Sequence, residues 1–102
     1  MTLKAAFIFV APDCNPQQHQ AVVPSPVVEL HVVGVKNYHE AAEAAQQLVA
    51  QGVAAIELCA GFGHEGVAAV QHAVGPDIAV GVVRFDLHPG FEHRSGDVLF
   101  QD

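Results

Sequence analysis

The chain contains few charged residues, and basic residues are the rarest of them. Charged side chains make up 15% of the 102 residues, whereas about a quarter is typical of soluble domains. Four Lys and Arg stand against eleven Asp and Glu, so the formal net charge is −7. No basic stripe is present, which argues against nucleic acid and anionic membranes as partners.

Cysteine and long apolar runs are also scarce. The two cysteines, Cys14 and Cys59, have neither the number nor the spacing of a disulfide framework or a metal site. We therefore expect reduced thiols and a cytoplasmic protein. No apolar run is long enough to span a bilayer. A chain of this length, without internal repeats, is expected to form a single domain over residues 1–102 with one modest core.

Apolar residues, by contrast, are plentiful and follow a strand–helix rhythm. Hydrophobic residues make up 51% of the chain, so apolar surface should be hidden at a subunit interface. Four segments rich in β-forming residues predict strands at residues 3–10, 27–36, 54–59 and 78–86. Residues 11–26 contain four prolines and predict a long loop, with a short helix that begins at Pro16. A tail with two turns and an apolar patch at residues 98–100 follows the last strand.

Two helices are predicted between the last three strands. Asn37 is a suitable N-cap with Glu40 at the capping-box position, and Gly52 ends this first helix. The second helix follows a glycine turn and ends at Gly75, which precedes a proline. Strands that are joined by right-handed helical crossovers form a parallel sheet.

Polar residues within the strands decide between two architectures for this sheet. Helices cover both faces of a doubly wound sheet, but only one face of an open barrel segment. Glu29 and His31 alternate with apolar residues in the second strand, as Glu57 and Cys59 do in the third. Burying such groups unpaired beneath a helix costs several kcal/mol each. We therefore predict a four-stranded, mainly parallel, half-barrel-like βαβαβ sheet with helices on one face and a polar open face that oligomerisation covers.

The segment from Ile56 to Gly66, IELCAGFGHEG, carries the main site hypothesis. It predicts the end of a strand, a glycine turn and the first turn of a helix. Free backbone N–H groups and the helix dipole attract anions at such a turn. A guanidinium opposite the turn would strengthen the site. The expected ligand contacts are Gly61, Phe62, Gly63, His64, Arg84 and Lys36.

The same turn allows two other interpretations. Its glycines match the pattern G-x-G-x-x-G, and Asp86 lies where a dinucleotide-binding fold keeps its ribose acid. However, polar residues interrupt the preceding strand, and only one further strand follows. The simplest alternative is that the glycines permit a tight turn and close packing.

Three residues near the turn are candidates for catalysis. Glu57, paired with His31 or Glu29 on the open face, could abstract a proton next to a carbonyl group. The alternative is a polar network that fixes the oligomer. Cys59 precedes a helix N-terminus, which favours the thiolate, and His64 could serve as its base. A small buried hydrophobe is the alternative role of this cysteine.

A metal site is a further possibility, because the chain contains seven histidines. Asp86, His88 and His93 could converge on one ion. No recognised metal motif is present, so we assign no metal ligands and no cofactor.

Several segments resemble known families. Residues 44–58, AAQQLVAQGVAAIEL, are similar to one βα repeat of aldolase-type (β/α) barrels. Nearly the whole chain resembles a small bacterial family of short α/β proteins with no assigned activity. That second resemblance rests on VGVK at 33–36, on the glycine-turn segment at 56–66 and on GVVRFD at 81–86.

These observations lead to three functional hypotheses. The main one is a cytoplasmic homo-oligomer that binds a small anionic metabolite, bearing phosphate or carboxylate, at the C-terminal edge of the sheet. The second is a lyase or isomerase with Glu57 or His64 as general base and the anion site as its handle. The third is a structural subunit that binds no ligand.

Overall fold

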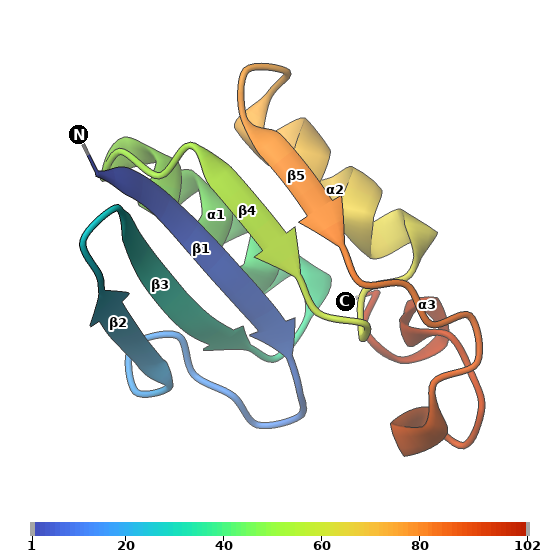
Figure 1. Cartoon of the computed structure of the whole chain (residues 1–102). Helices are drawn as coiled ribbons and strands as arrows, with labels where there is room; N and C mark the ends of the chain where they lie inside the picture. Colours follow the sequence, from blue (N-terminus) through green and yellow to red (C-terminus); the bar gives the residue numbers. More distant parts are fainter. Residues whose placement is uncertain (1, 102) are drawn as a thin grey trace.

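In the computed structural model, which describes residues 2–101, five strands form one sheet in the order β2-β3-β1-β4-β5 (Figure 1). The strands are β1 (Leu3–Val10), β2 (Gln20–Pro24), β3 (Val28–Val35), β4 (Ala55–Leu58) and β5 (Ala79–Val82). The helices are α1 (Tyr38–Ala50), α2 (His64–Val74), the short α3 (Gly96–Leu99) and the 3-10 turn η1 (Pro89–Phe91). Among these helices, none has the length and apolar character needed to cross a membrane.

The fifth strand, β2, lies in the segment that was expected to be a loop. It pairs antiparallel with β3, whereas the other neighbouring strands are parallel. The expected helix after Pro16 is reduced to a single turn. Asn15 caps this turn by accepting the Gln17 N–H at 2.9 Å, the Asn15 carbonyl accepts the His19 N–H at 2.7 Å, and the chain enters β2 at the next residue. A proline at the end of β2 is tolerated because β2 is an exposed edge strand.

The strand order explains why one face of the sheet has no helical cover. The crossovers from β3 to β4 and from β4 to β5 run in the same direction, and α1 and α2 lie on the same side of the sheet (Figure 1). The connection from β1 to β3 runs in the opposite direction and contains no helix. Because β3 and β4 flank β1, the order is not the sequential one of a barrel segment, and the half-barrel prediction is wrong.

Helix α1 begins and ends as the sequence predicts. The Asn37 side chain accepts the Glu40 N–H at 2.8 Å, and the Glu40 carboxylate reaches back to the Lys36 N–H at 2.9 Å. Gly52 follows the helix with a φ of 103°, a conformation that favours glycine. Alanines of α1, with Leu48, pack on Ile8 and the rest of the core between the helices and the sheet.

The strand register corrects the prediction of one polar face. Ala6 of β1 is the register partner of both His31 and Ile56, whereas Phe7 is the partner of Glu57. Adjacent partners point to the same face of a sheet. His31 therefore lies on the helix-covered side, and Glu57 lies alone on the open side. The alternation of side chains within each strand was predicted correctly. This alternation does not determine how neighbouring strands are aligned, so the face on which each polar residue lies was not predicted.

The open face is consequently apolar rather than polar. Its side chains come from alternate positions on all five strands, and Glu57 is the one charged residue at those positions. The larger apolar members are Phe7, Phe9, Val28, Leu30 and Val32.

The Asn37 cap gives a first testable prediction. Asn37→Ala should lower the free energy of unfolding by about 1 kcal/mol, because the Glu40 N–H loses its acceptor. Asn37→Asp, which keeps the acceptor, should lower it much less. Urea unfolding curves measure both values, and equal losses in the two variants would show that the cap does not stabilise α1.

Candidate functional site

The backbone N–H groups of the glycine turn already have partners within the protein. The N–H of Gly61 donates to the Cys59 sulfur at 3.3 Å, and the N–H of Phe62 donates to the Cys59 carbonyl at 3.1 Å. The N–H of Gly63 donates to the Tyr38 hydroxyl at 3.1 Å. An external anion at this turn must therefore compete with internal acceptors.

A carboxylate from the C-terminal tail lies at the start of α2. Asp97 Oδ2 accepts the Glu65 N–H at 3.2 Å, and Asp97 Oδ1 accepts the Tyr38 hydroxyl proton at 2.9 Å. Gly63, the N-cap of α2, provides no side-chain acceptor, and any side chain there would collide with the Asp97 carboxylate. We call the Glu65 N–H, the Tyr38 hydroxyl and Gly63 the carboxylate seat. The turn thus holds an internal anion.

The tail that carries Asp97 also packs on the glycine turn that follows β4 and on the start of α1, which follows β3. Gly96 packs directly on the Gly61 carbonyl, where a Cβ has no room. Phe100 is 5% exposed, and its carbonyl accepts the Tyr38 N–H at 3.0 Å. The strand order reverses at β1, and open α/β sheets bind ligands at such reversals. In this structure the tail occupies that position.

Tyr38 joins the tail to the glycine turn. Its ring stacks on Phe62 with a centroid distance of 5.5 Å, and its side chain is buried. Burial is the main cause that raises the pKa of the Tyr38 hydroxyl; the hydrogen bond from the Gly63 N–H lowers this pKa, and the Asp97 and Glu65 carboxylates raise it by smaller amounts. The phenol therefore stays protonated and serves as a donor to Asp97.

Arg84 lies beside the first residue of α2, as the anion hypothesis requires. Its guanidinium nitrogens are 2.9 and 2.6 Å from the ring nitrogens of His64, and it pairs with Asp86 at 2.6 Å. His64 and Arg84 are both exposed. Within residues 2–101, no hydrogen bond joins His64 to Cys59, whose sulfur accepts the Val10 N–H at 3.4 Å.

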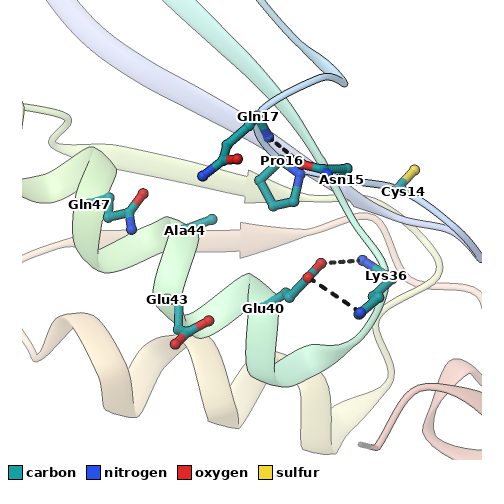
Figure 2. A pocket seen from close by; sticks show the side chains of 9 residues that line it. All are labelled: Cys14, Asn15, Pro16, Gln17, Lys36, Glu40, Glu43, Ala44 and Gln47. Atoms are coloured by element: carbon teal, nitrogen blue, oxygen red, sulfur yellow. Dashed lines mark hydrogen bonds and ion pairs between the residues drawn. The ribbon is translucent and has the colours of Figure 1, made fainter.

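Lys36 belongs to a different part of the surface. Its ammonium group is 3.9 Å from the Glu40 carboxylate, and both line a hollow of about 310 Å³ between the loop after β1 and α1 (Figure 2). Glu43 adds a second carboxylate to this hollow. Burial, followed by the charges of Glu40 and Asp13, raises the pKa of the Cys14 thiol. This acidic hollow does not favour an anion.

The polar residues of β3 pair with each other and not with Glu57. His31 Nε2 lies 2.7 Å from Glu29 Oε2, and His31 lines a second hollow of about 220 Å³. This hollow adjoins the first, since both are lined by Gln17 and Gln47. The expected pairing of Glu57 with His31 is wrong, because these residues lie on opposite faces of the sheet.

The tail histidines do not converge on a metal site. Among residues 2–101, no group of three or more His, Cys, Asp or Glu side chains lies close enough to hold an ion. His88 instead accepts the Gly90 N–H at 3.0 Å and stacks on Phe91 with a centroid distance of 4.0 Å.

Fold and site together define a small α/β domain with a bare sheet face and a C-terminal edge covered by its own tail. Residues 3–98 match a family described as a family of unknown function, DUF6506. The chain belongs to that family, in agreement with the expected resemblance to a family without assigned activity. No link to aldolase-type barrels is shown. No curated protein and no solved structure matches the chain significantly.

Asp97 is the residue that the sequence analysis missed. Residues 95–97 read only as a turn near the end of the chain, and nothing local indicates contact with a helix more than thirty residues earlier. The one local indication was Gly63. A glycine at the N-cap of a helix has no side chain to accept the first backbone N–H groups, so another part of the chain must supply the acceptor.

Alkaline titration tests the Tyr38 environment. Tyr38 is the single tyrosine and the chain has no tryptophan, so ultraviolet absorbance of the phenolate reports this residue alone. The folded chain should ionise well above the ordinary pKa of about 10, at which the urea-unfolded chain ionises. The unfolded state then binds fewer protons, so stability should fall as the pH rises above 10. Identical titrations of the folded and unfolded chain would contradict the assignment.

A double-mutant cycle tests the steric match between Gly63 and Asp97. Gly63→Ala should lower the free energy of unfolding by about 1–3 kcal/mol, because the new methyl group displaces the carboxylate. The same substitution should cost much less in an Asp97→Ala background. Additive losses would mean that Gly63 is required for another reason.

Proposed function

We propose that the chain binds a small anionic metabolite at the C-terminal edge of the sheet, with its phosphate or carboxylate in the carboxylate seat. The observation that carries this proposal is the position of Asp97. A carboxylate there meets a backbone N–H, a phenol donor and the positive end of an eleven-residue helix. These are the contacts that an external phosphate or carboxylate requires.

Arg84 supplies the second contact in this proposal. Its guanidinium lies next to His64 at the start of α2, and Asp86 is its present anionic partner. A phosphate in the seat would attract Arg84 away from Asp86 and could accept two parallel N–H bonds from it. Lys36, which pairs with Glu40, has no part in this arrangement.

Competition with Asp97 sets the kind of ligand that we expect. A tethered carboxylate acts at an effective concentration of roughly millimolar or more. An external ligand therefore needs more contacts than Asp97 makes, and a doubly charged phosphate that engages both the seat and Arg84 meets this condition. Both cysteines are free, and we place this binding in the cytoplasm.

The lyase or isomerase alternative has less support. Glu57 lies on the open face, among apolar residues and away from the helix-covered side. A neutral His64 ring has a single acceptor nitrogen, and because both ring nitrogens lie within 3.0 Å of the guanidinium of Arg84, which only donates, that acceptor is not free to act as a base in this conformation.

Chemical rescue tests the proposal. Asp97→Ala should lower the free energy of unfolding by about 1–2 kcal/mol, because the Glu65 N–H and the Tyr38 hydroxyl lose their acceptor. Acetate or inorganic phosphate at millimolar concentrations should then reverse most of the decrease in Tm, since each anion binds only the folded state. Arg84→Gln in the same background should reduce the recovery by phosphate more than that by acetate.

Asp77→Ala is the matched control for this experiment. Asp77 is exposed, whereas Asp97 is half-buried, and Asp77 lies beyond the opposite end of α2. If the anions raise the Tm of both variants equally, they act as general salts, and Asp97 is a structural cap without a ligand counterpart.

A further inference from the structure

We propose that the open face of the sheet is the interface of a homodimer, in which two copies pack sheet against sheet. This interface is independent of the carboxylate seat. No helix in residues 2–101 covers the face, although its strand positions are apolar apart from Glu57. Leu3 is 48% exposed and Val23 is 55% exposed on its two sides. Monomeric proteins rarely leave a continuous apolar surface of this kind in water.

The size of the face suits a dimer that associates weakly. In the arrangement described below, β1 and β3 with eight residues each face β4 and β5 with four each, and at a rise of about 3.3 Å per residue and a strand spacing of about 4.8 Å these four strands have a projected area of roughly 380 Å² per copy. Stable interfaces bury about 800 Å² per partner. The accessible surface of the protruding side chains exceeds the projected area, and Val83, which is 53% exposed just after β5, adds to it, so the interface lies at the small end of this size range.

One half of the face protrudes and the other half is low, so two copies of the face can fit together. This shape favours a second copy of the chain over a different partner. The half over β1 and β3 carries large side chains, including Phe7, Leu30 and Val32. The half over β4 and β5 carries small ones, and the space above Gly81 is open. We call these halves the ridge and the low half.

A two-fold axis that runs parallel to the strands, between β1 and β4, brings the ridge of each copy onto the low half of the other. Every contact is then made twice. The same axis places Glu57 of each copy over the apolar β1 of its partner, so this carboxylate opposes association.

Two substitutions test the interface from its two halves. Val32→Lys places a charge on the ridge, and Gly81→Val fills the low half, where a Cβ meets no atom within 4 Å. Neither touches the core on the helix-covered side, so circular dichroism should show an unchanged fold. Sedimentation equilibrium should find a dimer for the unaltered chain and a dissociation constant at least about tenfold higher for each variant.

Val98→Lys and Glu57→Gln complete the experiment. Val98 is 63% exposed on α3, outside the face, so the same charge there should leave the dimer unchanged. Glu57→Gln should tighten the dimer by about tenfold, since a buried charge is removed. A monomeric unaltered chain at high micromolar concentrations overturns the proposal. A dimer that both Val32→Lys and Gly81→Val leave intact also overturns it and points to pairing through the edge strands β2 or β5.

Discussion

The connection from β1 to β3 contains no helix, and this constraint determines which surfaces of the molecule remain bare. Right-handed crossovers in one direction place α1 and α2 on the same face of the sheet. A helix in the first connection would lie on the opposite face by the same rule. Because residues 11–24 form turns and an edge strand instead, the apolar residues of β1 and β3 lack a second layer. A domain of 102 residues has little else with which to cover them.

The carboxyl ends of the strands have the opposite character, since the tail covers them. Phe100 anchors the tail in the core, and Asp97 neutralises the start of α2. Tyr38 couples the two, because its backbone N–H bonds to Phe100 and its hydroxyl bonds to Asp97. Release of Asp97 by a competing anion would therefore remove one side-chain attachment of the tail while the Phe100 anchor remains.

The sequence predicted local structure well and distant contacts poorly. The cap at Asn37 and the end of α1 at Gly52 depend on neighbouring residues, so their signals are local. The face on which Glu57 lies depends on the register between strands, which alternation within a strand does not determine. Asp97 contacts Glu65 across a long stretch of chain, and no local pattern encodes such a contact. The strand β2 was not predicted, because prolines usually argue against a strand. An edge strand nevertheless tolerates them.

The glycine pattern G-x-G-x-x-G now has a steric explanation that differs from dinucleotide binding. A Cβ at Gly61 would meet Val10, one at Gly63 would meet Asp97, and one at Gly66 would meet the ring of Tyr38. Each glycine thus makes room for a side chain of this protein, whereas in a dinucleotide fold the second glycine lets the backbone approach the pyrophosphate. Gly63 differs from the other two glycines, because the group that occupies the space above it, the Asp97 carboxylate, is an anion. A phosphate that replaced the Asp97 carboxylate would occupy the same space, which is open because Gly63 has no Cβ.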